Sequence, residues 1–236
     1  MRQPQPIGCG CFVYGDLNME AKMFEKLSKY GVIPVIAVDT AESGLRTCEA
    51  LLEGGLPVAE ITFRTAAAAD TIKMASERLP QMILGAGTVL TAEQVRIAAD
   101  AGAKFAVAPG CNPRIVSAAQ AVGLPFAPGV CTPSEIEIAM DLGCKLLKFF
   151  PAEASGGVKM LKTLSGPYAH TGLKFCPTGG VSLNNLTDYL SLPIVAFVGG
   201  SWIVPKEAVK AHDWKAIEGI TKETVEKVTK TREQSK

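Results

Sequence analysis

The sequence predicts an α/β protein folded as a closed (β/α)8 barrel, or TIM barrel, with an additional N-terminal helix. Apolar runs typical of buried strands alternate with helical segments about eight times along the chain. The chain has 236 residues, which is close to the usual length of one such barrel. Glycine and proline recur where the predicted strands end, as in the loops at a barrel mouth.

An open, doubly wound sheet is the alternative fold. Its dinucleotide-binding form carries three spaced glycines after a strand and an acidic residue further along the chain. Here Gly85 and Gly87 lack the further glycine and the distal acid. The barrel is therefore favoured.

The chain begins with a segment of no clear period, residues 1–18, in which proline and glycine recur. We expect an irregular extension there and a single catalytic domain over residues 19–236. Apolar residues at three- and four-residue steps predict a first helix over 20–30, and Gly31 ends it.

The barrel elements follow in order. Apolar runs predict strands over 32–38, 58–63, 82–89, 105–108, 126–130, 146–150, 174–177 and 194–198, and Pro128-Gly129 interrupts the fifth of them. Helices are expected over 41–53 and 65–79, from Thr91 to Gly102, from Gly110 to Val122, from Thr132 to Leu142, over 155–164, from Ser182 to Leu190, and from Asp213 past Val228. The predicted N-caps are Thr40, Thr91, Thr132, Ser182 and Asp213.

Composition and charge exclude several classes of protein. Apolar residues make up 47 % and charged residues 20 %, which fits a compact globule, and the net charge of +1 offers no basic surface for nucleic acid. No apolar run is long enough for a membrane span, and no secretory signal is recognised. Seven scattered cysteines, without a Cys-x-x-Cys pair, predict reduced thiols and a cytoplasmic location.

Lys148 lies within a short apolar run, where a buried lysine is unusual. Burial disfavours an ammonium group, so a lysine in such a strand can act as a neutral amine nucleophile. Strand alternation places Leu146, Lys148 and Phe150 on one face. A lysine at a strand end that reaches solvent is the alternative.

Glu60, Thr62 and Arg64 share a face of the second predicted barrel strand. Charged groups inside a barrel are costly unless they are paired or catalytic, so this pattern indicates a site. A structural Glu60–Arg64 ion pair is the alternative. On the third strand, Thr88 shares a parity with Leu84, which brings its hydroxyl to the barrel mouth, although it could also serve a turn or a cap.

Paired glycines follow the last two predicted strands, Gly179-Gly180 and Gly199-Gly200. Barrels often bind phosphate on backbone N–H groups at those two loops. A phosphate site is therefore predicted there, with ordinary turn chemistry as the alternative.

Together these residues suit Schiff-base chemistry on a 2-oxo acid. The Lys148 amine can form an imine, Glu60 can transfer protons, and Arg64 with Thr88 can hold a substrate carboxylate. The glycine loops can hold a phosphate at the far end of the substrate.

Six motifs appear in the order found in the KDPG/KHG aldolases, the class I enzymes of 2-dehydro-3-deoxy-phosphogluconate (KDPG) that often also act on 4-hydroxy-2-oxoglutarate (KHG). The resemblance spans about residues 20–226. The motifs are Glu60-Ile61-Thr62-Phe63-Arg64, Gly85-Ala86-Gly87-Thr88-Val89, Lys148-Phe149-Phe150-Pro151-Ala152-Glu153, Gly156-Gly157-Val158-Lys159, Phe175-Cys176-Pro177-Thr178-Gly179-Gly180 and Gly199-Gly200-Ser201-Trp202.

This resemblance implies a metal-free, cofactor-free homotrimeric lyase acting on small molecules, with Lys148 as the Schiff-base lysine and Glu60 as general acid/base. It implies that Arg64 and Thr88 bind the pyruvate carboxylate. The phosphate would be held by Gly179, Gly180 and Ser201, with Thr178 nearby, and the pocket lined by Pro109 and Phe150.

Three alternatives remain open at this point. One is an aldolase for the galactonate-derived substrate, which the residues around the phosphate loops disfavour. Another is a phosphate-binding barrel synthase or isomerase that forms no Schiff base and often needs a metal. The third is a non-catalytic phosphometabolite-binding protein, which would have no need for a nucleophilic lysine.

Overall fold

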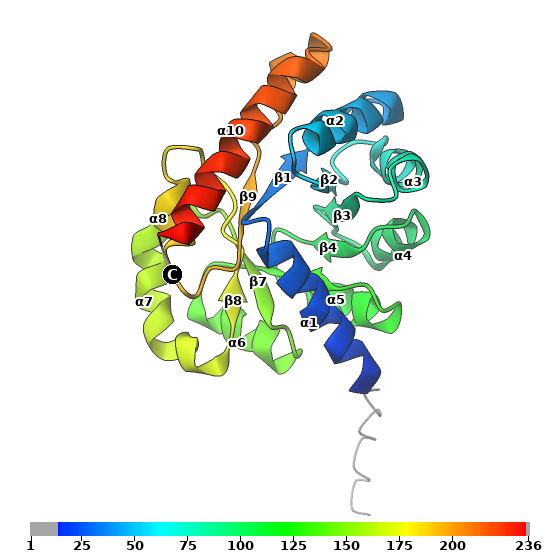
Figure 1. Ribbon diagram of the computed structural model, residues 1–236. Helices are drawn as coiled ribbons and strands as arrows, with labels where there is room; N and C mark the ends of the chain where they lie inside the picture. The colour runs from blue at the N-terminus through cyan, green and yellow to red at the C-terminus, as the bar shows by residue number, and fades with distance from the viewer. Residues whose placement is uncertain (1–13, 235–236) are drawn as a thin grey trace, which may run out of the picture.

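The computed structural model describes residues 14–234, and its strands and helices alternate along the chain (Figure 1). The strands are β1 (Val32–Ile36), β2 (Val58–Thr62), β3 (Ile83–Gly87), β4 (Phe105–Val107), β5 (Phe126–Ala127), β6 (Gly129–Val130), β7 (Leu146–Phe149), β8 (Lys174–Phe175) and β9 (Val198–Gly200). The helices are α1 (Tyr14–Ser28), α2 (Ala41–Glu53), α3 (Ala68–Arg78), α4 (Ala92–Asp100), α5 (Pro113–Ala121), α6 (Pro133–Asp141), α7 (Gly157–Tyr168), α8 (Leu186–Leu190), α9 (Lys206–Lys210) and α10 (Trp214–Glu233), with 3-10 turns at Glu153–Ser155 and Ala169–Thr171.

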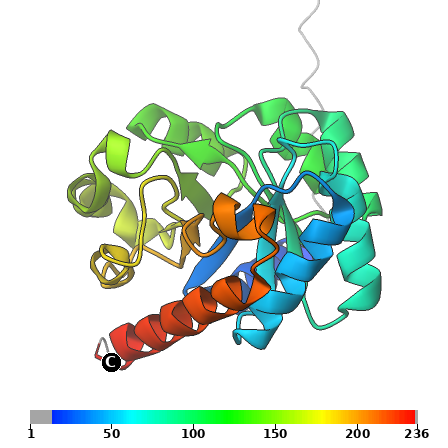
Figure 2. The same cartoon turned by 90° about the horizontal axis from the view of Figure 1, so that it is seen from above.

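The strands form two parallel sheets with the helices around the outside (Figure 2). One sheet has six strands in the order β5-β4-β3-β2-β1-β9, and the other has three in the order β6-β7-β8. The prediction of an α/β fold with a parallel sheet is confirmed, but a single continuous ring of eight strands is not shown. Pro128 separates β5 from β6, because proline has no N–H to donate to a strand ladder.

The core follows from the apolar strand sequences. Every residue of β2, β3 and β7 is buried, as expected for parallel strands covered by helices. The helices that cover them begin at capping side chains: Thr40, Thr91 and Asp213 accept backbone N–H groups, and Thr132 forms a capping box with Glu135. Among the described residues, no helix is both long and apolar enough to cross a membrane.

Several predicted boundaries were wrong, and three of them affect the first helix, the last strand and the eighth helix. Helix α1 begins at Tyr14 rather than at residue 20, so part of the segment predicted to be irregular is helical, and residues 1–13 lie outside the described part. The last strand begins at Val198, where predicted strand 194–198 ends, so Gly199 and Gly200 belong to the strand rather than to the loop after it. The eighth helix begins after Asn185, whose amide oxygen accepts the Ser182 N–H, so Ser182 is not its cap.

Candidate active site

A buried lysine–glutamate pair lies at the centre of the molecule. Lys148 Nζ donates to Glu60 Oε1 at 3.0 Å, and the two residues are 5 % and 4 % exposed. Glu60 comes from β2 of the six-stranded sheet and Lys148 from β7 of the three-stranded sheet, so the contact crosses the interior between the sheets. The structure thus contradicts the alternative reading of Lys148 as a solvent-reaching lysine.

Glu60 also does not pair with Arg64, which was the structural alternative for this strand. Arg64 Nε instead donates to the Thr62 hydroxyl at 3.2 Å, and that hydroxyl donates to the Ile36 carbonyl at 2.8 Å. The exposed Arg64 side chain therefore lies at the C-terminal end of β2, just beyond the buried Glu60. Its role in binding a carboxylate stays a prediction.

Glycine at position 87 makes room for the Glu60 carboxylate. A Cβ atom at Gly87 would lie 2.2 Å from Glu60 Oε1, closer than any Cβ contact allows. Strand pairing brings this about, because Thr62 on β2 is opposite Gly87 on β3. Gly87 therefore positions the carboxylate that contacts Lys148.

Thr88 follows Gly87 directly and has a left-handed backbone, with φ of 56°. This conformation is strained for a β-branched residue, and such strain is concentrated at functional sites. Since β2 and β3 are paired, Thr88 and Arg64 extend from neighbouring strand ends. Their predicted partnership in binding a carboxylate fits this arrangement.

Two further predicted residues lie close to Lys148. The Phe150 ring centroid is 5.8 Å from Lys148 Nζ, which confirms that the two side chains share a face. The Pro109 carbonyl packs against Gly129, where a Cβ atom would lie 2.1 Å from its oxygen, and Gly129 is the strand partner of Lys148. Both residues therefore border the strand that carries the lysine.

The loop after β8 has the geometry of an anion site. Gly179 and Gly180 have φ of 97° and 82°, and their carbonyl oxygens accept from Glu153 N and Asn185 Nδ2. Within residues 14–234, neither N–H of this glycine pair donates a hydrogen bond to another group of the chain. Successive free N–H groups of this kind form concave anion-binding nests.

The residues around that loop connect it to the rest of the site. A Cβ atom at Gly179 would lie 3.4 Å from the Phe150 ring, and one at Gly199 would lie 2.3 Å from the Thr178 hydroxyl. Ser201, which is exposed, follows β9 directly. The predicted lysine and phosphate regions are therefore contiguous.

Cys176 is a close neighbour of the Lys148–Glu60 pair that the sequence analysis did not single out. It is the residue after β8, in register with Lys148, because Leu147 pairs with Phe175. Burial raises the pKa of this thiol to about 12, while Lys148 lowers it and Glu60 raises it again. The Cys176 side chain is therefore an uncharged thiol at neutral pH.

Among residues 14–234, no group of three or more His, Cys, Asp or Glu side chains could hold a metal ion.

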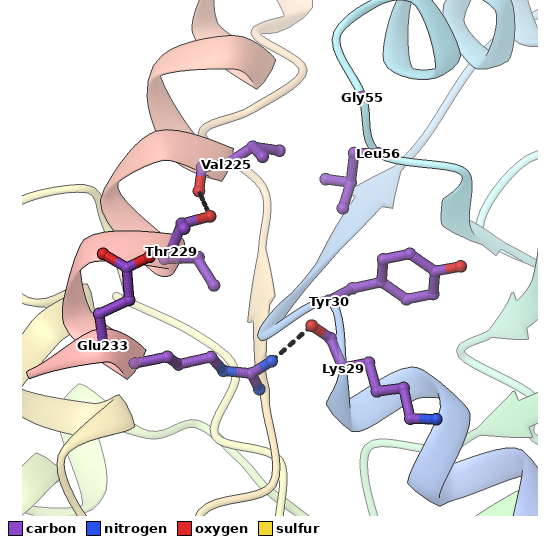
Figure 3. Close-up of a pocket in the computed structure, with 9 residues that line it drawn as sticks. Lys29, Tyr30, Gly55, Leu56, Val225, Thr229 and Glu233 are labelled. Carbon is purple, nitrogen blue, oxygen red and sulfur yellow. Dashed lines mark hydrogen bonds between the residues drawn. The ribbon is translucent and has the colours of Figure 1, made fainter. Parts of the chain in front are cut away.

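A separate surface pocket lies at the other end of the strands, where β1 and β2 begin (Figure 3). Tyr30 and Leu56 line one side of it and α10 lines the other. Arg232 donates to the carbonyl oxygens of Ser28, Lys29 and Ala196, which fastens α10 to the end of α1. Burial lowers the pKa of this guanidinium. The pocket contains none of the predicted site residues.

The role of Gly87 was missed from sequence, where it was placed in the predicted strand 82–89 and considered for a dinucleotide-binding motif. The sequence indicates this role only indirectly. In the parallel sheet, Gly87 comes into register with the end of β2, beside Glu60. Glu153, which packs against the Gly179-Gly180 loop, and Tyr189, which donates to Glu153, were also not identified. Glu153 belongs to the Lys148 motif, but nothing in the sequence indicates that Tyr189 would contact it.

Comparison with known proteins agrees with this geometry. Residues 23–220 match the family described as KDPG and KHG aldolase. The 2-dehydro-3-deoxy-phosphogluconate aldolase of Haemophilus influenzae is 47 % identical over 205 residues, which cover 87 % of this chain and 96 % of that protein.

Two crystal structures are similar in sequence and fold. The KDPG aldolase of Legionella pneumophila, with pyruvate captured as a covalent carbinolamine, is 42 % identical with a TM-score of 0.81, over 84 % of this chain and 96 % of that one. The aldolase of Zymomonas mobilis with 3-phosphoglycerate is 35 % identical with a TM-score of 0.79, over 85 % and 94 % of the two chains. The chain thus belongs to the KDPG and KHG aldolase family.

Proposed function

We propose that the protein is a class I aldolase that cleaves KDPG to pyruvate and glyceraldehyde 3-phosphate, and KHG to pyruvate and glyoxylate. The observation that carries this proposal is the buried contact of 3.0 Å between Lys148 Nζ and Glu60 Oε1. It gives a nucleophilic amine and a proton-transfer group within hydrogen-bonding distance, which is the requirement for Schiff-base catalysis. The family membership of the chain supports the same activity.

In the proposed first half of the reaction, Glu60 accepts a proton from the Lys148 ammonium. The neutral amine attacks C2 of the substrate, and its nitrogen forms a bond to that carbon as the C–O π bond breaks. A proton passes from the nitrogen to the oxygen, which becomes a hydroxyl. Glu60 returns the proton to that hydroxyl, water leaves, and a protonated imine remains. Arg64 and Thr88 hold the adjacent carboxylate during these steps.

In the second half, Glu60, or a water that it holds, removes the proton of the C4 hydroxyl. The C3–C4 bond breaks, its electron pair moves into the imine to give an enamine, and the aldehyde leaves. Protonation of the enamine at C3 and addition of water release pyruvate and restore the Lys148 amine. Each of these steps transfers one proton to or from a reacting atom beside Glu60. The single Glu60 carboxylate can therefore act as the acid or the base in all of them.

The phosphate of KDPG would bind at Gly179, Gly180 and Ser201, with Thr178 beside them. The free N–H groups of the glycine pair support this assignment. Pro109 and Phe150 would line the pocket between the phosphate loop and the lysine. Replacement of Ser201 should then weaken binding of the phosphorylated substrate more than binding of KHG.

We also propose a closed barrel of eight strands, in which β5 and β6 act as one interrupted strand. Isolated parallel bridges from Phe175 to Val195 and from Thr178 to Gly199 connect β8 with the region of β9, which supports closure. On the family resemblance, we propose a homotrimer whose single catalytic domain spans residues 19–236. It would act in the cytoplasm, in the Entner–Doudoroff pathway.

The direct test is turnover of KDPG, its galactonate-derived isomer and KHG, with pyruvate measured by a coupled lactate dehydrogenase assay. Release of pyruvate from KDPG with a higher kcat/KM than from the galactonate-derived isomer supports the proposal. A preference for that isomer would transfer the assignment to the related aldolase. No cleavage of any of the three by the folded protein would contradict an aldolase function.

A further inference from the structure

The glycine loop after β8 rests on the side chain of Glu153. A Cβ atom at Gly180 would lie 2.5 Å from Glu153 Cγ, so the stem of this glutamate packs directly against the loop. The backbone N–H of Glu153 also donates to the Gly179 carbonyl at 3.0 Å. Any movement of Glu153 is therefore transmitted to the two residues that present their N–H groups.

The carboxylate of Glu153 is held at the far end of that stem. Its Oε1 accepts a hydrogen bond from the Tyr189 hydroxyl on α8, and a Cβ atom at Gly157 would lie 2.9 Å from the same oxygen. Gly157 is the first residue of α7, and an acidic group is favoured at the N-terminus of a helix. The negative charge is therefore directed toward α7.

The donor in this contact is rigid, while the acceptor is not. Tyr189 is fully buried, whereas Glu153 is exposed. Burial, and then the bond to Glu153, raises the pKa of Tyr189, so its hydroxyl remains protonated and can donate at any physiological pH. Without that hydroxyl, an exposed glutamate could adopt rotamers that bring its charge toward the loop.

We propose that Tyr189 and Glu153 form a positioning pair that adapts the Gly179–Gly180 loop to a phosphate dianion. Tyr189 keeps the Glu153 carboxylate directed to α7, so that its charge does not oppose the phosphate while its stem supports the loop. The pair determines the preference for phosphorylated over unphosphorylated substrates. This inference rests on the proposed function of the same site.

The experiment compares kcat/KM for KDPG and KHG in the wild type and three variants. In Tyr189→Phe, we expect the KDPG-to-KHG ratio of kcat/KM to fall by about three- to tenfold, the order that a carboxylate several ångströms from a phosphate produces in a watery environment. In Tyr189→Phe with Glu153→Gln, the charge is gone, and the ratio should return to within about twofold of wild type.

The chain offers a matched control for the loss of a tyrosine hydroxyl. Tyr168 is the last residue of α7, at the opposite end of that helix from the Gly157 contact, and it donates to Glu137 Oε1 on α6 at 3.2 Å. Tyr168→Phe removes the same kind of bond and should leave the ratio unchanged. An unchanged ratio in Tyr189→Phe, or a double variant as defective as Tyr189→Phe alone, would overturn the proposal, because the effect would then be absent or due to packing.

A binding measurement separates this inference from the proposed function. Calorimetric titration with inorganic phosphate requires no turnover, so it applies even if KDPG is not a substrate. Phosphate binding that is weakened about three- to tenfold in Tyr189→Phe and restored in the double variant supports the positioning pair whatever the substrate is. Equal binding by the wild type and Tyr189→Phe refutes the pair, whether or not KDPG is cleaved.

Discussion

Replacement of Gly87 by alanine should impair catalysis without disturbing the fold. Gly87 lies in extended strand β3, a conformation that alanine adopts readily. The added Cβ would lie 2.2 Å from Glu60 Oε1 and 2.8 Å from its Cδ, whereas real Cβ contacts are longer than 3.0 Å. The end of the Glu60 side chain must therefore move by about 0.8 Å or more.

That displacement is large compared with the geometry of the pair. A Lys148–Glu60 contact of 3.0 Å lengthened by this amount is no longer a hydrogen bond. Misplacement of a catalytic group by about 1 Å can reduce a rate by about 100-fold. We therefore expect kcat on KDPG to fall by about 10- to 100-fold, or about 1.4 to 2.7 kcal/mol in activation free energy.

The assay is steady-state pyruvate release together with thermal unfolding of each variant. Gly85→Ala is the control in the same strand, since its Cβ would lie 2.2 Å from the buried Phe105 ring and should cost about 1–3 kcal/mol in the free energy of unfolding instead. Gly219→Ala, where nothing lies within 4 Å, controls for the substitution itself. A well-folded Gly87→Ala protein with wild-type kcat would refute the role of the Glu60 position.

Three other predictions concern separate parts of the molecule. Lys148→Ala should lose nearly all pyruvate release, and substantial steady-state activity in a folded variant would contradict the mechanism. Ser201→Ala should raise KM for KDPG more than KM for KHG, and equal effects on both would exclude a phosphate role. Glu135→Gln tests stability. The Cys131 and Thr132 backbone N–H groups lower the pKa of Glu135 below its usual 4.5. The carboxylate therefore contributes about 1 kcal/mol to the free energy of unfolding above that pH, and this contribution is lost as the carboxylate protonates in the folded protein. Urea unfolding at several pH values should show the variant and wild type converging in acid, and a pH-independent difference would contradict this account.

Strand periodicity was enough to predict which face Lys148 occupies. Leu146, Lys148 and Phe150 were expected on one face, and the Lys148 contact with the Phe150 ring bears this out. Periodicity could not predict which residues meet across the interior, because β2 and β7 are not neighbours in either sheet. The ion pair of Lys148 with Glu60, rather than of Glu60 with Arg64, depends on that tertiary arrangement.

Boundaries near proline and glycine were the other weak point. The interruption of strand 126–130 at Pro128 was predicted. In contrast, Gly199 with Gly200 continues a strand that was expected to end before them, and β8 ends at Phe175 although a strand was predicted over residues 174–177. In both cases the outcome depends on hydrogen bonds to a neighbouring strand, which local sequence does not contain. Glycine at position 87 shows the same limit, since its role depends on a side chain from another strand.

The central claim is that Lys148 forms a covalent imine with a 2-oxo acid. The most direct measurement is borohydride reduction of the wild-type protein in the presence of pyruvate, followed by peptide mass mapping, with Lys148→Ala as the control. The account predicts a reduced pyruvyl adduct on Lys148 and none in the variant. No adduct on the folded wild-type protein, or an adduct on another lysine, would contradict it.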